Sequence, residues 1–578
     1  MKKTLNKEKI INIAFLTVVL LVFCFSLFSS EMHVSHDSYF HMNRLVGLVD
    51  AFRDHQFLPK VYPYTNNGYG YATPLFYCDL FLYPFAILYW LGVPLVICYK
   101  LMIAFYSFLG IFIVFIVGKK IFKGNKLTPY FLTIIYTFSN YRLYDVYARG
   151  SLGEIFAFAF VPLIFYSIYK IFFLKQDSWI MLGISFALLL LSHNISFALY
   201  CALFFLFIVL YIFVNRKDLE DLKCRAITTI KAVIIAILLS SWYLFPMFEQ
   251  FMDQTFIVNH LSTMYDLENS IMPLSTILRP FANMDTKEIH IFTLINIGWP
   301  LLFLPMLYAF VPKKEKNIYV SASVIAMYVV ILFTTGFFIQ LTKIFGFVQF
   351  MFRFYIIVYP VLSFASSYVF DKINLSQKMR YSLLIVLIIY STFNSCLIQI
   401  EALNDGKSYS LNIKNNITKE EMYDDFSEER KLHDYNALEI SGAEYLPTTE
   451  IVDYLDETTF IKEITSDGYL DYIYDFERNF TKIWFNVESP SRKLIMLPQT
   501  YYKGYQAYKV VDGEKIEIEA INVPNYKKVG FYIDEGYGEY YCEYKGTTVQ
   551  NISLATSTVS LIYVICAIIK GSKNRKLI

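Results

Sequence analysis

Residues 10–41, IINIAFLTVVLLVFCFSLFSSEMHVSHDSYFH, join an apolar run to a polar loop, and this junction indicates what kind of protein the chain forms. The run from Ile10 to Ser30 contains no charged side chain and is long enough to cross a bilayer as a helix. No A-x-A-like cleavage site precedes Glu31, and further apolar runs follow. We therefore expect an uncleaved first membrane helix rather than a signal peptide.

Apolar runs of similar length recur along the whole chain. Of its 578 residues, 56% are hydrophobic and only 17% are charged, and the mean hydropathy is +0.43. This composition is typical of an integral membrane protein and argues against a soluble enzyme. We expect a polytopic α-helical membrane protein with about twelve transmembrane helices. The expected spans are residues 10–30, 95–117, 127–140, 153–171, 178–191, 195–214, 227–246, 292–311, 318–337, 352–370, 381–399 and 552–569.

Basic residues indicate the orientation of these helices, because cytoplasmic loops are enriched in Lys and Arg. Threading the chain through the expected spans places every basic connection on one side, provided that residues 74–93 do not cross. That segment contains Asp79 and Pro84 and is rich in aromatic residues, which favours an interfacial or re-entrant segment. Both termini are then predicted to be cytoplasmic. The basic connections lie at residues 2–9, 119–126, 170–175, 216–225, 313–316, 372–380 and 570–576.

Near residue 400 the apolar runs give way to a long polar segment, which predicts a domain outside the membrane. Short alternating stretches, separated by Gly, Pro and Asn, are typical of β-strands in a small sandwich-like module. They are KIWFNV (482–487), KLIMLP (493–498), YQAYKVV (505–511), KIEIEAI (515–521) and KVGFYI (528–533). The polar segment contains only Cys542 and cannot close an internal disulfide. We expect a transmembrane domain at 1–399 with a first extracytoplasmic loop at 31–94, an extracytoplasmic mainly-β domain at 400–551, and a final helix with a basic tail at 552–578.

Ionisable side chains collect at the expected outer ends of the membrane helices. Because such groups are costly at membrane depth, they are candidates for a functional site. The stretches YRLYDVYARGSLGE (141–154), LSHN (191–194) and QFMFRF (349–354) bring polar groups from separate parts of the chain to this level, and we expect them to line one cavity with Asp37. The other candidate site residues are His36, His41, Arg44, Asp145, Arg149, Glu154, His193, Asn194 and Arg353.

A surface helix is predicted for residues 38–54, directly after Asp37. Its apolar face would carry Leu45, Leu48, Val49 and Phe52. Asp37, His41 and Arg44 are spaced four and three residues apart and would share a polar face. The structural alternative is that Asp37 only caps this helix and that the basic residues only decorate the membrane interface.

Structural roles also stay open for the other candidates. Arg149 and Glu154 can form an ion pair near a helix start, and His193 can pack between helices. Arg353 can extend toward the interface, but its outer position runs against the positive-inside trend. An anionic ligand would account for that position, because arginine binds phosphate oxygens with a fork of donors.

Taken in order, these motifs resemble bacterial YfhO-like membrane proteins, which are similar to the wider GT-C glycosyltransferases. The resemblance extends from about residue 10 to residue 550. Some relatives carry a label that refers to pyruvoyl-tetrahydropterin synthase, but nothing in these residues indicates pterin chemistry. The motifs are the aspartate loop after the first span, LPKVYPYTNNGYGYATPLFY (58–77), YDVYARGSLGE (144–154), LSHN (191–194), QFMFRF (349–354) and GAEYLP (442–447).

The resemblance implies a transferase that takes a sugar from a polyprenyl-phosphate donor and passes it to a cell-envelope glycopolymer or glycolipid, for example a teichoic acid. It also implies a multi-pass protein of the bacterial plasma membrane, with its active site outside the cytoplasm, membrane lipids as neighbours and no nucleic acid partner. GT-C enzymes use an acid in the first outer loop, which by position is Asp37. Many carry two adjacent acids, whereas here the neighbour is His36. No cofactor is therefore assigned, and a divalent cation (Mg²⁺ or Mn²⁺) is an open alternative.

Two other functions stay open at this point: a flippase or transporter of lipid-linked saccharides, and an inactive scaffold for envelope assembly. The confinement of charged groups to one face favours the transferase. A flippase should carry ionisable residues near mid-membrane or at both faces.

Overall fold

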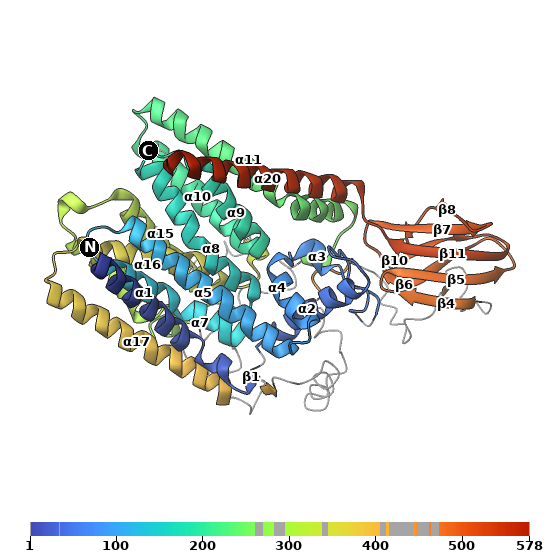
Figure 1. Ribbon diagram of the computed structural model, residues 1–578, viewed down its shortest axis with the longest axis horizontal. Helices are drawn as coiled ribbons and strands as arrows, with labels where there is room; N and C mark the ends of the chain where they lie inside the picture. The colour runs from blue at the N-terminus through green and yellow to red at the C-terminus, as the bar shows by residue number, and fades with distance from the viewer. Residues whose placement is uncertain are drawn as a thin grey trace. The chain divides into compact units, whose positions relative to one another are not determined.

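The computed structural model describes residues 2–33, 35–66, 68–260, 270–281, 295–337, 345–404, 412–414, 443–448, 462–463 and 473–576. The chain divides into two compact units. The first unit comprises residues 1–38, 94–236 and 261–418, and the second comprises residues 39–93, 237–260 and 419–578. The expected polytopic helical fold with a C-terminal β region is confirmed (Figure 1). The three domain boundaries inferred from the sequence stay a prediction.

Long apolar helices build the first unit. Most of its hydrophobic runs form a single long helix, whereas the run at 299–310 divides into α14 (Trp299–Phe303) and the 3-10 segment η8 (Leu304–Phe310). The helices are α1 (Lys2–Phe23), α5 (Leu95–Ile121), α6 (Thr128–Thr137), α7 (Asn140–Tyr144), α8 (Leu152–Ile168), α9 (Trp179–Ser192), α10 (Asn194–Val214), the first part of α11 (Leu219–Asp253), α13 (Leu274–Ile277), α14 (Trp299–Phe303), α15 (Ile318–Thr334), α16 (Tyr355–Lys372) and α17 (Gln377–Asn404).

Seven helices in the described part of the chain are long and apolar enough to cross a membrane. They are Leu95–Ile121, Leu152–Phe173, Asn194–Val214, Leu219–Asp253, Met351–Lys372, Gln377–Ile400 and Thr548–Lys570, and each coincides with an expected span. Three other expected spans correspond to the shorter apolar helices Trp179–Ser192, Trp299–Phe310 and Ile318–Thr334. Residues 74–93, expected not to cross, fold as the short helices α3 (Thr73–Phe76), η2 (Leu80–Leu82) and α4 (Tyr83–Trp90).

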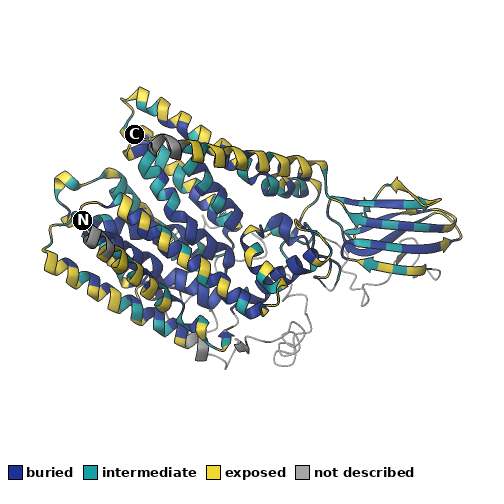
Figure 2. Cartoon of the chain, in the orientation of Figure 1, coloured by how far each residue is buried: buried dark blue, intermediate teal, exposed yellow. Residues whose placement is uncertain are grey.

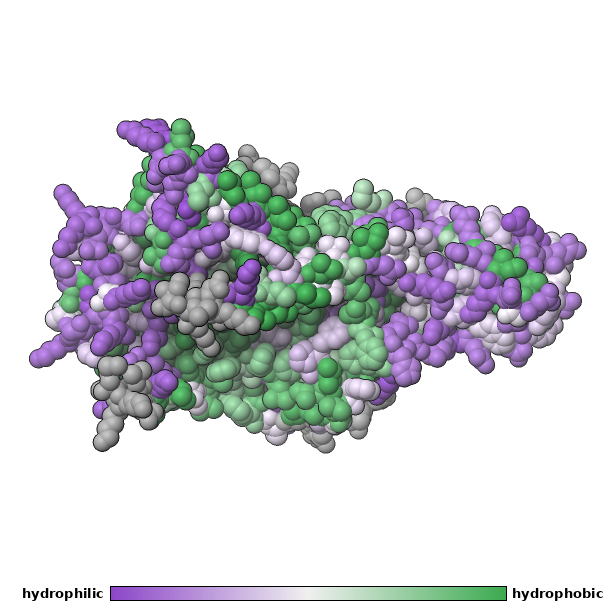
Figure 3. Space-filling view, turned by 45° about the horizontal axis from the view of Figure 1, so that its top comes forward, coloured by the Kyte–Doolittle hydropathy of each residue, from purple (hydrophilic) through white to green (hydrophobic). Residues whose placement is uncertain are grey.

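Helices α8 and α16 form the interior of the first unit. The most apolar window of α16 is 89% buried and that of α8 is 67% buried, whereas only 17% of the window in α10 is buried. Small residues such as Ser363 and Ser367 on α16 allow close approach of its neighbours, and their hydroxyls donate to carbonyls four residues earlier. Figure 2 shows the same contrast between the interior helices and exposed α17. In Figure 3 hydrophobic residues form the middle of the helical part, whereas its left end and the strands are mainly hydrophilic.

The second unit contains α2 (Ser38–Arg53) almost entirely, together with the end of α11 and the final helix α20 (Thr548–Lys576). Helix α2 confirms the helix predicted for residues 38–54, and its predicted apolar face is buried. Helices α11 and α20 pack through small residues: Ser241 Oγ lies 2.8 Å from Ser557 Oγ, and the backbone N–H of Trp242 donates to the latter atom at 3.0 Å. Such contacts are typical of helices that associate in a membrane.

The second unit also carries two antiparallel sheets with the strand orders β3-β6-β10-β9 and β4-β5-β11-β7-β8. The five predicted stretches fall on strands, which confirms the sandwich-like module. A further β1–β2 pair belongs to the first unit. The strands are β1 (Glu31–His33), β2 (Asn412–Lys414), β3 (Lys462–Glu463), β4 (Ile473–Asn479), β5 (Lys482–Ser489), β6 (Lys493–Thr500), β7 (Tyr505–Val511), β8 (Glu514–Ile518), β9 (Ile521–Asn522), β10 (Lys528–Ile533) and β11 (Gly536–Tyr544).

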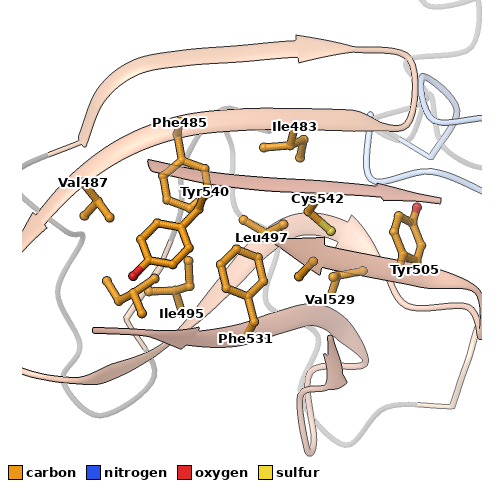
Figure 4. Packing of buried hydrophobic residues seen from close by; sticks show 12 residues of the cluster. Ile483, Phe485, Val487, Ile495, Leu497, Tyr505, Val529, Phe531, Tyr540 and Cys542 are labelled. Carbon is orange, nitrogen blue, oxygen red and sulfur yellow. The ribbon is translucent and has the colours of Figure 1, made fainter. Parts of the chain in front are cut away.

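Alternate side chains of the strands fill one core between the two sheets. Phe485, Ile495, Phe531 and Tyr540 lie in this core, each at most 1% exposed (Figure 4). Cys542 is buried in the same cluster and forms no disulfide. Because the side-chain period of a strand is two, the core residues alternate with outward-facing neighbours such as Tyr532.

We predict that Phe531→Ala will lower the free energy of unfolding of the β module by about 3–5 kcal/mol, because it removes a fully buried ring and leaves a cavity. The matched control is Tyr532→Ala, which truncates the next residue, 49% exposed. Thermal unfolding of the purified full chain, followed by fluorescence, compares the two variants. Equal losses of stability would show that the cluster around Phe531 is not the core of this module.

Candidate functional site

The first unit brings Asp145, Arg149, Glu154 and Arg353 together at the N-terminal ends of α8 and α16. Arg149 lies in η3 (Asp145–Arg149), a single wide turn of π-helix that ends at Gly150. Such turns are frequent at functional sites because they re-aim side chains without ending the helical path. These contacts tie segments that are distant in the sequence. Whether they form a catalytic site stays a prediction.

Arg149 is the centre of this buried cluster. Its Nη1 lies 2.7 Å from Glu154 Oε1 and 3.0 Å from Asp145 Oδ1. Its guanidinium carbon is 5.1 Å from the centre of the Phe352 ring. All three charged side chains are at most 4% exposed. The ion pair that the sequence left open is therefore formed, in surroundings where an unpaired charge would be strongly unfavourable.

Glu154 connects the two arginines. Its Oε2 accepts a hydrogen bond of 2.5 Å from Tyr141 Oη, and its Oε1 lies 3.5 Å from Nε of Arg353. Glu154 is in the first turn of α8, where the helix dipole stabilises a negative charge. One carboxylate thus shares its charge between guanidinium groups that come from before α8 and before α16.

Asp145 has a different environment from Glu154. Its Oδ2 is buried and has no hydrogen-bond partner among the described residues. Burial, and after it the charge of Glu154, raises the pKa of Asp145 well above the usual range for an aspartic acid. Glu154 contacts both guanidinium groups, whereas Asp145 contacts Arg149 alone, and its raised pKa weakens the tendency of Asp145 to carry a charge. Arginine guanidinium groups are suited to bind the oxygens of an anion.

Arg353 is held in place by its own short loop. Its Nη1 donates to the carbonyl oxygen of Val348 at 3.2 Å and to the side-chain oxygen of Gln349. Gln349 has φ 68°, a left-handed conformation that side chains other than glycine rarely adopt. The Arg353 side chain is 11% exposed, more than Arg149, and its Nε forms no hydrogen bond within the described residues. It is the more accessible of the two guanidinium groups.

The loop that carries Asp37 lies against the last residues of η3. The backbone N–H of Asp37 donates to the carbonyl of Arg149 at 2.8 Å, and that of His36 donates to the carbonyl of Ala148 at 3.2 Å. Burial works against the charge of Arg149, but nearby acids, Glu154 foremost and Asp37 among them, raise its pKa well above its usual range. Asp37 is half-buried and His36 is exposed. A partly accessible carboxylate is therefore held beside the arginine cluster.

Gly150 makes this close approach of the two segments feasible. Its φ of 65° lies in the left-handed region, and a Cβ on this residue would lie 2.1 Å from Ser35 Oγ. Ser35 is held in place because its backbone N–H donates to Ser38 Oγ at 3.1 Å in the turn before α2. It therefore cannot easily move away from an added Cβ. Glycine is thus required here by both the backbone conformation and the packing.

His193 and Asn194 stand at the start of α10. His193 is the N-cap residue, and its Nδ1 accepts the backbone N–H of Ser196 at 3.3 Å. Burial lowers the pKa of His193 to about 3, which favours the neutral imidazole. The capping contact gives His193 a structural role, in line with the helix-packing alternative. Asn194 is the half-buried first residue of the helix.

His41 and Arg44 belong to the second unit, where Arg44 pairs with Asp79. Arg44 Nε donates to Asp79 Oδ1 at 2.8 Å, and its Nη1 lies 3.0 Å from His41 Nδ1. Its guanidinium stacks 4.3 Å from the Tyr77 ring centre, and Asp79 also accepts from Tyr62 Oη at 2.6 Å. These contacts satisfy Arg44 inside its own unit. The sequence marks Asp79 as a lone aspartate in an apolar segment, but it does not identify Arg44 as its partner.

Two residues that contact the arginine cluster are not among the candidates predicted from the sequence, although both belong to the quoted stretches 141–154 and 349–354. Tyr141 and Gln349 each contact it directly, but one tyrosine among 48 carries no distinguishing signal. Gln349 is marked only by its backbone conformation, which the sequence does not disclose. Among the described residues, no three His, Cys, Asp or Glu side chains converge as a metal site, and the divalent cation stays a prediction.

Comparison with known proteins identifies a family. A family model described as "6-pyruvoyl-tetrahydropterin synthase related domain; membrane protein" matches residues 75–402. An uncharacterized protein from Lactococcus lactis subsp. cremoris (strain MG1363) is 26% identical over 274 residues, which are 46% of this chain and 42% of that protein. The arabinofuranosyltransferase AftD from Mycobacteria, solved by single-particle cryo-EM, aligns with a TM-score of 0.40 and 14% identity over 73% of this chain and 28% of the AftD chain. The chain thus spans less than half the length of either protein.

We predict losses of stability of very different size for the two acids of the cluster. Glu154→Gln removes the charge that two buried guanidinium groups share and should destabilise the protein by about 3–5 kcal/mol. Asp145→Asn keeps the shape and the acceptor of a protonated acid and should lower stability by less than about 1 kcal/mol. Thermal unfolding in detergent measures both. A larger loss for Asp145→Asn than for Glu154→Gln would overturn the assignment of the charge to Glu154.

The packing at Gly150 gives a second prediction. Gly150→Ala adds a Cβ that collides with Ser35 as well as straining the backbone, so it should destabilise the protein more than backbone strain alone. Gly513→Ala is the control, because Gly513 shares a positive φ (81°) but has no atom within 4 Å of the added Cβ. The comparison uses the melting temperatures of both variants, and equal shifts would contradict the close contact between residues 35 and 150.

Proposed function

We propose that this chain, which belongs to the membrane-protein family described as 6-pyruvoyl-tetrahydropterin synthase related, is a glycosyltransferase. It would move a sugar from a polyprenyl-phosphate-linked donor to a cell-envelope acceptor outside the cytoplasm, such as a teichoic-acid-type polymer or a glycolipid. The observation that carries the proposal is the half-buried Asp37, whose backbone is hydrogen-bonded to Arg149 beside the buried contacts of Arg149, Arg353 and Glu154.

The two parts of this arrangement suit the two needs of the reaction. The bond between the sugar and the phosphate breaks with its electrons on the phosphate oxygen, and a cationic cluster stabilises that charge. The more exposed guanidinium of Arg353 is the group that would contact the phosphate, and Arg149 would add its field from the interior. Meanwhile the acceptor hydroxyl loses its proton to Asp37 as its oxygen bonds to the anomeric carbon.

The lipid-linked donor follows from where the reaction is proposed to occur. No nucleotide sugar is available outside the cell, so an activated sugar must be carried across the membrane on a lipid. The resemblance of the ordered motifs to YfhO-like proteins and GT-C glycosyltransferases favours this donor class and an outer active site. It also names Asp37 by position in the first outer loop. The family description refers to a pterin synthase. Pterin chemistry would give the arginine cluster no role, and we do not include it in the proposed function.

We predict that deletion of the gene will remove a hexose or N-acetylhexosamine from an envelope polymer or glycolipid, measured by mass spectrometry of isolated envelope glycans. The wild-type chain should restore the modification and Asp37→Asn should not, because an amide cannot accept the hydroxyl proton. Asp50→Asn is the matched control: Asp50 is an acid on α2 whose carboxylate pairs with exposed Arg53 at 3.2 Å. It should restore the modification fully.

The same experiment separates the competing functions. Full restoration by Asp37→Asn, at equal protein levels in the membrane, would refute the role of Asp37. Strains that lack the wild-type chain should accumulate the sugar on its lipid carrier. This result does not discriminate, because it is expected for both a transferase and a flippase. The two differ in vitro: purified transferase releases polyprenyl phosphate from the lipid-linked sugar when acceptor is present, whereas a flippase or a scaffold releases none.

A further inference from the structure

A cavity of about 440 Å³ lies among α5, α8, α10, α15 and α16, all within the first unit. It is distinct from the arginine cluster. The cavity is lined by Ile168 at the C-terminal end of α8, while Glu154 is in the first turn of that helix, fourteen residues earlier. At 1.5 Å per residue, the two positions are roughly 21 Å apart along the axis. The cavity and the cluster thus occupy opposite ends of the same helices.

The walls of the cavity are apolar and rigid. Phe165 of α8 stacks on Phe364 of α16 with ring centres 4.5 Å apart and planes within 13°. Phe207 of α10 contacts Tyr319 of α15 at 5.7 Å, and both line the cavity. Most lining side chains are aliphatic or aromatic, with the tyrosines, Asn317 and Ser323 as scattered polar groups, and such walls suit a hydrocarbon chain.

The charged lining residues, by contrast, gather at one end of the cavity. Lys123, Asp371 and Lys372 lie at or just beyond the C-terminal ends of α5 and α16. Asp371 Oδ1 accepts the backbone N–H of Asn125 at 2.9 Å and the hydroxyl of Thr128 at 3.1 Å, which anchors the loop that bears Lys123. An apolar cavity with a polar mouth matches an amphipathic ligand.

The charges at the mouth favour an anion. Lys372 Nζ forms ion pairs with Glu315 Oε2 at 3.4 Å and with Asp371 Oδ2 at 3.6 Å. Its positive charge is therefore compensated within the protein. Lys123 is exposed and forms no ion pair or hydrogen bond with any other residue that the structure describes. It also lies in the basic connection 119–126, on the side where the lysine distribution predicts the cytoplasm and its anionic lipids.

We propose that this cavity binds one acyl chain of an anionic glycerophospholipid from the cytoplasmic leaflet, with Lys123 contacting its phosphate. Basic pockets between membrane helices on that side are the usual sites of such lipids. The site holds a structural or regulatory lipid and is separate from the proposed sugar-transfer site, so neither proposal depends on the other.

Native mass spectrometry of the purified full chain tests the proposal with phosphatidylglycerol and phosphatidylcholine of identical acyl chains. We expect wild-type protein to bind one phosphatidylglycerol at least about 10-fold more tightly than phosphatidylcholine, since each basic residue near a lipid surface contributes a several-fold gain. Lys123→Glu should weaken phosphatidylglycerol binding by roughly 10-fold. Lys126→Glu, an exposed lysine of the same loop that does not line the cavity, should leave binding unchanged.

A second pair of variants tests the cavity itself. Ser323→Phe fills it from α15 and should abolish binding of the lipid, whereas Ala322→Phe, at the neighbouring position outside the lining, should not. Equal binding of both lipids, or equal effects of Lys123→Glu and Lys126→Glu, would overturn the proposal. So would displacement of phosphatidylglycerol by an equal concentration of polyprenyl phosphate, which would assign the cavity to an isoprenoid lipid instead. Sugar transfer by the same variants reports independently on the proposed function.

Discussion

The buried charge of Arg149 is the constraint on which the arrangement of the first unit depends. A guanidinium group at 4% exposure must be paired, because its desolvation is not recovered otherwise. Its partners come from its own π-helical turn and from the first turn of α8, and Glu154 then reaches Arg353 in front of α16. One set of ion pairs therefore fixes the starts of the two most buried membrane helices relative to each other.

The position of Asp37 is a consequence of the same segment. Its loop is held by carbonyl groups of residues 148 and 149, and the approach is close enough that residue 150 must be glycine. Displacement of the π-helical turn would move both the guanidinium of Arg149 and the backbone acceptors of the Asp37 loop. The carboxylate and the cation are thus positioned together rather than by separate elements, which is what a reaction that needs a base and an anion site at a set separation requires.

The sequence predicted those parts of the structure that depend on periodicity. In KVGFYI the apolar residues Val529, Phe531 and Ile533 recur at every second position and are buried, whereas Tyr532 is exposed, as a period of two requires. Long membrane helices follow from apolar length in the same way. The contacts of the candidate site could not be predicted in this way, because they depend on local backbone geometry. The π-helical turn at Asp145–Arg149 and the left-handed Gln349 have no compositional signature, and the pairing of Arg44 with Asp79 required knowledge of how residues 74–93 fold.

The helix dipoles favour some of the buried or partly buried cations and oppose others. Lys372 lies in the last turn of α16, where the negative end of the dipole favours a positive charge. Arg149 and Arg353 stand before the N-terminal ends of α8 and α16, where the same dipole opposes them. Arg149 has two acids within ion-pair distance, Asp145 at 3.0 Å and Glu154 at 2.7 Å, whereas Arg353 has only its more distant contact of 3.5 Å with the shared Glu154 among the described residues. The charge of Arg353 is therefore the less compensated of the two at the end of the helices where the dipole disfavours it, and an anionic ligand is the partner that would balance it.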